Sequence, residues 1–105
     1  MKVQPFHLAI PVQDLKKCRT FYRDVLNCKE GRSAEHWVDF NFFGHQLVIH
    51  QKDDFKPNRI SNPVDGHEVP VPHFGVVLSW ENWQDLADNL NANNTTFVIK
   101  PCIRF

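Results

Sequence analysis

The stretch that decides the fold is Pro5-Phe6-His7-Leu8-Ala9-Ile10-Pro11-Val12-Gln13-Asp14-Leu15. Phe6, Leu8 and Ile10 alternate with His7 and Ala9, which predicts a strand over Val3 to Val12 with its histidine on the face away from the core. Asp14 follows at once and is a suitable residue to cap the start of a helix. The stretch therefore predicts a strand that leads directly into a helix.

The residues downstream continue this pattern. Asp14 to Leu26 carries an apolar stripe at helical spacing, and Asn27 can end the helix because asparagine tolerates the left-handed conformation. Three strands are then expected, near Lys29 to Arg32, over Trp37 to Phe43 and over Gln46 to Gln51, with Gly44-His45 as the turn between the last two.

The second half of the chain starts the same order again. Lys52 to Pro70 is polar, rich in proline and without a hydrophobic period, which predicts a connecting loop. Val71 to Leu78 then predicts a strand, Ser79 can cap a second amphipathic helix that Asn93-Asn94 ends, and Thr95 to Ile99 predicts a further strand.

His7 and His73 occupy equivalent positions in the two halves, each on the face of its predicted strand opposite the core residues. The apolar stripes of the two helices correspond as well. A tandem repeat of this kind predicts two similar modules that share one core. Pseudo-twofold symmetry would bring the two histidines together on the concave face of a curved sheet.

The opening stretch, together with Phe21-Tyr22 and Val25-Leu26, resembles the start of a vicinal-oxygen-chelate domain, the group of glyoxalases, bleomycin-resistance proteins and extradiol dioxygenases. Phe40 to His50 is similar to the strands that finish the first module of that fold, and Val71 to Leu78 to the first strand of the second module. The resemblance implies an α+β fold of tandem βαβββ modules. It divides this single domain into module one (1–52), a connecting loop (53–70) and an incomplete module two (71–105).

The resemblance also implies a divalent metal held by two histidines and one glutamate, sometimes with a fourth ligand. His7 and His73 match the two histidines. The fourth position falls on Val48, which cannot coordinate a metal, so His50 is the nearest substitute on the same face and Gln46 is another candidate. The glutamate belongs to a last strand that would follow Phe105, so the expected glutamate ligand is absent from the sequence.

The ligand hypothesis competes with a simpler one for each of these residues. A single histidine is more often a surface or core group satisfied by hydrogen bonds than a ligand. Recurrence at equivalent repeat positions favours the ligand role for His7 and His73, and neutral imidazole suits Fe²⁺, Mn²⁺, Ni²⁺ or Zn²⁺. Asp39 could line the cavity, although a solvated polar face is the commoner situation.

Two functions of different classes fit the resemblance. One is a metal-dependent enzyme on a small oxygenated molecule, by glyoxalase-type isomerisation or extradiol cleavage, in which the metal acts as a Lewis acid. The alternative is a metal-free module that binds or sequesters a drug, with a cleft of neighbouring aromatic residues (Trp37, Phe40, Phe42 and Phe43), or an inactive fragment of such a domain. An open sheet edge predicts a homodimer, in which Glu35 or Glu68 of a second copy could complete a metal site.

Composition excludes several other classes. Twelve basic and twelve acidic residues cancel, which argues against a nucleic-acid groove or an anionic membrane surface as partner. The start of the chain is unlike a signal peptide and no apolar run reaches the length of a membrane span, so a cytoplasmic location is expected. The three widely spaced cysteines form no disulfide framework.

Overall fold

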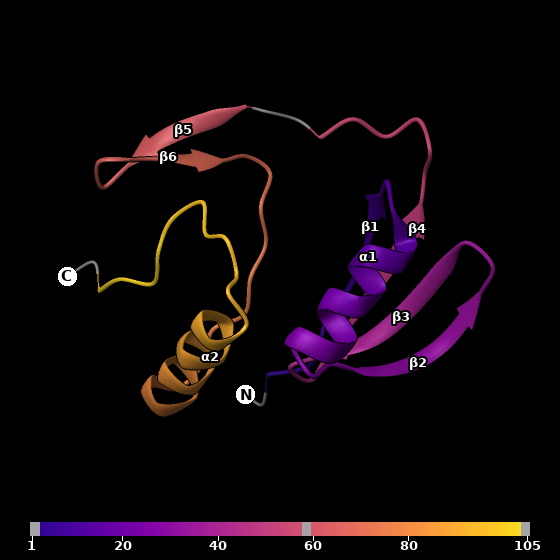
Figure 1. Ribbon diagram of the computed structural model, residues 1–105, viewed down its shortest axis with the longest axis horizontal. Helices are drawn as coiled ribbons and strands as arrows, with labels where there is room; N and C mark the ends of the chain where they lie inside the picture. Colours follow the sequence, from indigo (N-terminus) through magenta and orange to yellow (C-terminus); the bar gives the residue numbers. More distant parts are fainter. Residues whose placement is uncertain (1–2, 58–59, 104–105) are drawn as a thin grey trace. The chain divides into compact units, whose positions relative to one another are not determined.

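The computed structural model describes residues 3–57 and 60–103. These form two units, Met1–Lys56 and Pro57–Phe105, and each is described by itself. The first unit holds strand β1 (His7–Val12), helix α1 (Leu15–Thr20), a π-helical turn η1 (Phe21–Val25), and strands β2 (Lys29–Ala34), β3 (Trp37–Phe42) and β4 (His45–Gln51) (Figure 1). Its four-stranded sheet has the order β1-β4-β3-β2, with β1 parallel to β4 and the other pairs antiparallel. This is the βαβββ module predicted from the sequence, although β1 begins at His7 and not at Val3.

The first helix starts and ends where its sequence predicts. Asp14 caps it, because its Oδ1 accepts a hydrogen bond from the backbone N–H of Lys17 at 3.0 Å. The last turn is π-helical, with the N–H of Leu26 donating to the carbonyl of Phe21. Asn27 follows with a φ of 57°, the left-handed conformation expected at this end.

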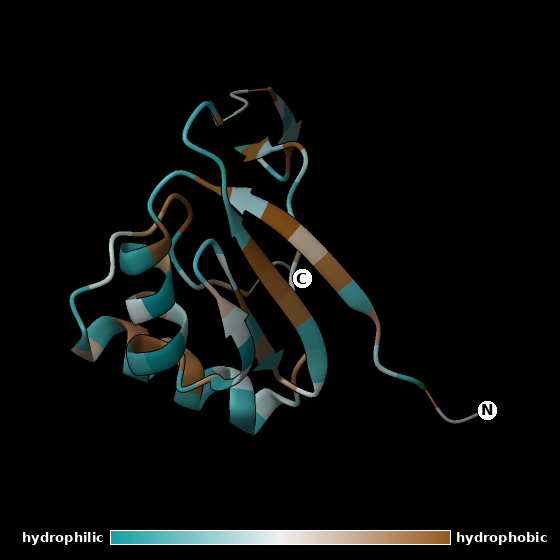
Figure 2. Ribbon diagram, turned by 90° about the vertical axis from the view of Figure 1, so that its right-hand side faces the viewer, coloured by the Kyte–Doolittle hydropathy of each residue, from teal (hydrophilic) through white to brown (hydrophobic). Residues whose placement is uncertain are grey.

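The core lies between the sheet and the helix. Val38, Phe40, Leu47 and Ile49 are fully buried. The ring of Tyr22 packs against that of Phe40 with centroids 5.5 Å apart, and burial raises the pKa of Tyr22 to about 12. Figure 2 shows the hydrophobic run in the middle of β4 between polar residues at both of its ends. Two of the four aromatic residues considered for a drug-binding cleft, Phe40 and Phe42, are therefore core residues of this unit.

The turn between β3 and β4 lies one residue earlier than predicted. Phe43 and Gly44 both have positive φ, 51° and 90°, which is the backbone of a two-residue type I′ hairpin turn. His45 is consequently the first residue of β4 and not part of the turn.

An ion pair ties the helix to β2. The guanidinium of Arg19 donates to both carboxylate oxygens of Glu30, with Nε–Oε1 at 2.6 Å and Nη2–Oε2 at 2.8 Å. This hydrogen-bonded pair lowers the pKa of Glu30 below its ordinary value of 4.5. The charged form of Glu30 is therefore favoured in the folded unit.

Acid is expected to remove the stabilisation that the Arg19–Glu30 ion pair contributes to the folded unit. Because the folded pKa of Glu30 lies below the unfolded one, its stabilisation is present above about pH 4.5 and is lost as the pH falls through the folded value. The pair is partly exposed, so the loss should be about 1 kcal/mol or less. Urea unfolding of the wild type and of Glu30→Gln across this pH range measures it. The difference between the two proteins should shrink in acid, and a constant difference would contradict the assignment.

The second unit differs from its prediction in three places. Strands β5 (Ser61–Val64) and β6 (His67–Pro70) form a hairpin within the segment 53–70 that was expected to be a loop. Its turn is Asp65-Gly66, both with positive φ, a strong hairpin signal in the sequence. Val71 to Leu78 and Thr95 to Ile99 form no strand, because neither segment finds a partner ladder for its backbone groups among the described residues. Those two strand predictions are wrong.

The second helix was predicted correctly. Helix α2 (Trp80–Ala92) is capped by Ser79, whose hydroxyl oxygen accepts from the N–H of Asn82. It ends at the Asn93-Asn94 pair, where Asn94 takes a φ of 56°. In the part of the chain that is described, neither helix is long and apolar enough to cross a membrane.

Candidate functional site

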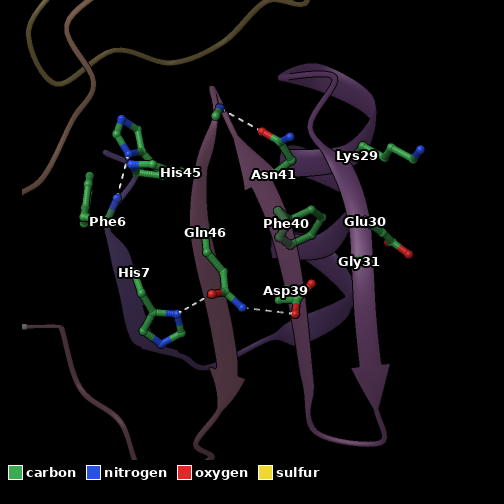
Figure 3. Close-up of a pocket in the computed structure, with 12 residues that line it drawn as sticks. Phe6, His7, Lys29, Glu30, Gly31, Asp39, Phe40, Asn41, His45 and Gln46 are labelled. Carbon is green, nitrogen blue, oxygen red and sulfur yellow. Dashed lines mark hydrogen bonds between the residues drawn. The ribbon is translucent and has the colours of Figure 1, made fainter. Parts of the chain in front are cut away.

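A groove of about 580 Å³ opens on the first unit (Figure 3). Its lining includes His7 from β1, Gln46 from β4 and Asp39 from β3. The strand register brings these residues together from distant parts of the sequence. On one side of β4, Gln46 pairs with His7 of β1, and on the other side Val48 pairs with Asp39 of β3. By the alternation of strands, all three lie on the face opposite the buried core residues. Asp39 thus lines the groove, the less common of the two situations weighed for it from the sequence.

A chain of hydrogen bonds joins the three side chains. His7 Nδ1 lies 2.8 Å from Gln46 Oε1, and Gln46 Nε2 donates to Asp39 Oδ2 at 3.5 Å (Figure 3). A carboxylate can only accept, so the amide NH₂ of Gln46 faces Asp39 and its oxygen faces His7. His7 Nδ1 must therefore donate. The neutral imidazole then carries its lone pair on Nε2, the nitrogen left open.

The Asp39 carboxylate is itself held by β2. Its Oδ1 accepts from the backbone N–H of Arg32 at 2.8 Å. The β2–β3 register shifts between Glu30 and Ser33, an irregularity that re-aims the backbone locally. Gly31 lies in this irregularity, and a Cβ there would overlap Asp39 Oδ1. Glycine at position 31 is therefore what lets the carboxylate approach the strand.

His73 has the same open nitrogen for a different reason. Its Nδ1 lies 2.7 Å from the backbone carbonyl oxygen of Pro70, at the end of β6. A carbonyl can only accept, so Nδ1 carries the proton and Nε2 the lone pair. The two histidines predicted as ligands, in two different units, thus share one tautomer.

His50 lies apart from His7. It is on the same face of β4 as Gln46 but four residues further along, about 13 Å at the rise of a strand. Its ring instead neighbours that of Trp37, with centroids 6.3 Å apart. Val48 is 7% exposed between Ala9 and Asp39. The residue that the structure brings beside His7 is Gln46.

The two glutamates proposed to complete a site in a dimer lie outside this groove. Glu35 is in the turn between β2 and β3 with its side chain 87% exposed. Glu68 is in β6 of the second unit and accepts a hydrogen bond from the Ser61 hydroxyl. Among residues 3–57 and 60–103, no three histidine, cysteine, aspartate or glutamate side chains lie together in a group that could hold a metal ion. His7 and His73, each with an open Nε2, fit the role of neutral imidazole ligands individually.

Comparison with known proteins decides the family. Residues 4–102 match the family model described as Glyoxalase/Bleomycin resistance protein/Dioxygenase superfamily. The chain belongs to this superfamily. The match spans both units, and it confirms the relationship inferred from the opening stretch.

Solved structures of the glyoxalase/bleomycin resistance/dioxygenase fold agree. A protein of that description from Alicyclobacillus acidocaldarius is 29% identical, with a TM-score of 0.69 over 87% of this chain and 64% of its own. A fosfomycin resistance protein, FosX, from Listeria monocytogenes is 18% identical, with a TM-score of 0.64 over 99% of this chain and 76% of its own. An integron cassette protein of Vibrio cholerae, 19% identical, has a TM-score of 0.55 over 97% of this chain and 77% of its own. The chain thus spans about two thirds to three quarters of these proteins, and the latter two share the fold alone.

Gln46 is the site residue whose role the sequence did not reveal. It was weighed only as a direct ligand, whereas in the structure it hydrogen-bonds to His7. The signal that would have found it is the parallel register of β1 with β4. That register pairs residues 39 positions apart, and no local pattern encodes it.

Proposed function

We propose that His7 and His73 are each divalent-metal ligands through Nε2, in a glyoxalase- or dioxygenase-type enzyme for a small oxygenated molecule. The observation that supports the proposal is that His7 and His73 share one tautomer. In both histidines Nδ1 lies within hydrogen-bond distance of an oxygen acceptor, which leaves Nε2 available. Metal-binding histidines characteristically use their other ring nitrogen in this way.

The groove supports a small-molecule substrate. Its volume of about 580 Å³ lies within the usual range for ligand sites. Polar groups converge there from several strands, and Asn41 is oriented by accepting from the N–H of Gly44. Phe6 contributes an aromatic wall, and its own backbone N–H donates to His45 Nδ1 at 3.0 Å. These residues would bind and orient the substrate, while a bound metal would supply Lewis-acid polarisation of its oxygens.

Metal retention tests the proposal. The protein is incubated with Fe²⁺, Mn²⁺, Ni²⁺ or Zn²⁺ in turn, desalted and analysed for metal per chain, with His7→Ala/His73→Ala in parallel. Near-stoichiometric metal in the wild type that is lost in the double variant is expected, because the variant lacks both imidazoles. Equal metal content in the two proteins, whether high or absent, would contradict the assignment. The homodimer stays a prediction and is checked by light scattering of the same samples.

A further inference from the structure

We infer that Gln46 and Asp39 are positioning residues that select the tautomer of His7 and so hold its Nε2 open for a metal ion. The inference deepens the proposed function and rests on it for the identity of the ligand. It does not make Gln46 itself a ligand. The side chain acts through His7, and it is in turn oriented by Asp39.

The tautomer of His7 is not set by the imidazole itself. A neutral imidazole carries its proton on either nitrogen, and only the form protonated on Nδ1 has a lone pair on Nε2. The partner of Nδ1 is the Gln46 amide at 2.8 Å. That amide is ambiguous too, since rotation by half a turn would present its NH₂ to His7. In that orientation Nδ1 would have to accept, and the proton would move to Nε2 and block it.

Asp39 removes the ambiguity. Its carboxylate has no hydrogen to donate, so the Gln46 NH₂ has to face it. The carboxylate is in turn placed by the Arg32 backbone N–H and by the space beside Gly31. The directional chain thus runs from the backbone of β2 through side chains of β3 and β4 to the imidazole on β1.

His73 provides an internal comparison. Its Nδ1 is hydrogen-bonded to the backbone carbonyl of Pro70, which can only accept a hydrogen bond. The tautomer of His73 therefore depends on no other side chain. Substitutions at positions 39 and 46 should change His7 and leave His73 as it is.

Asp39→Asn is the sharpest variant because it is nearly isosteric. The Arg32 N–H still needs an acceptor, so the new amide oxygen takes the position of Oδ1 and its NH₂ takes the position of Oδ2. Two NH₂ groups would then face each other unless Gln46 rotates and presents its oxygen to position 39. Rotation turns the Gln46 NH₂ toward His7, whose Nδ1 must accept. The variant should invert the tautomer of His7.

Asp39→Asn/Gln46→Glu is the matched rescue. A carboxylate at position 46 accepts both from the amide at 39 and from His7 Nδ1, so the original tautomer should return. Two-bond ¹H–¹⁵N correlation spectra of histidine-labelled, metal-free protein report the tautomer directly, at a pH above the ordinary titration range of histidine. We expect His7 protonated on Nδ1 in the wild type, on Nε2 in Asp39→Asn, and on Nδ1 again in the double variant. The signals of His73 should stay the same in all three.

Zn²⁺ affinity is measured on the same proteins. Loss of such a supporting hydrogen bond typically costs 10- to 100-fold in metal affinity, so Asp39→Asn should bind about 10- to 100-fold more weakly and the double variant should recover. A wild-type His7 protonated on Nε2, or a tautomer unchanged in Asp39→Asn, would overturn the inference even if Zn²⁺ binds. The predicted tautomer changes without Zn²⁺ binding by the wild type would support the positioning role and reject the proposed metal function.

Discussion

Phe40→Ala is expected to lower the free energy of unfolding of the Met1–Lys56 unit by about 3–5 kcal/mol. Phe40 is 1% exposed at the centre of β3, where its ring lies against Tyr22. Truncation removes the transfer free energy of the ring and leaves a cavity between the sheet and the helix, which the paired strands on both sides of β3 cannot close. A loss of this size is comparable to the whole stability of many small domains.

Phe21→Ala is the matched control for this variant. It deletes the same atoms from a side chain of the same unit whose residue is 37% exposed, so the loss should be clearly smaller. Native-state hydrogen exchange of the β3 and β4 amides measures the loss of unfolding free energy in both variants, because those amides report opening of this unit specifically. If Phe40→Ala fails to fold, Phe40→Leu is measured in its place, and its loss of unfolding free energy should be smaller than that expected for Phe40→Ala. Equal losses for Phe21→Ala and Phe40→Ala would mean that Phe40 is not at the centre of the core.

His7→Ala is expected to abolish Zn²⁺ retention, whereas His50→Ala should leave it within a few-fold of the wild type. The two histidines lie on one face of the same sheet, but His50 is about 13 Å further along the strands than the residue paired with His7. Metal–nitrogen bonds are about 2.0–2.1 Å long, so two imidazoles that share an ion must lie close together. His50 is too distant in this register to replace His7.

Isothermal titration of each metal-free variant with Zn²⁺ gives the comparison. His50→Ala serves as the control for removal of one imidazole from this sheet, and His73→Ala should reproduce the loss seen with His7→Ala. Weakened binding in His50→Ala together with retention in His7→Ala would return His50 to the ligand set and reject His7 as a ligand.

Much of the first module could be predicted from the sequence because its signals are local. Alternation around His7 marks a strand, and the apolar stripe between Asp14 and Asn27 marks a helix with both ends capped. Each signal needs only the near neighbours of a residue in the chain. The same reasoning located helix α2 after Ser79.

The errors lie where strand formation depends on a partner. Val71 to Leu78 has the composition of a strand but no ladder among the described residues, so its pattern alone does not make it one. The hairpin of β5 and β6 was missed because two prolines, Pro63 and Pro70, fall within its strands and suggested a loop. The Asp65-Gly66 turn outweighed them, since its positive φ values match the twist of a two-residue hairpin.

The sequence by itself determined the family and the elements of the first module, and it singled out His7 and His73. Only the tertiary structure decided what stands beside them. The register of β1 on β4 places Gln46 next to His7, and the irregularity in β2 delivers the Arg32 N–H to Asp39. A slip of one residue would turn Gln46 to the other face of the sheet. Which oxygen meets His7 Nδ1 is therefore set by pairing between distant strands, and periodicity within one strand carries no information about it.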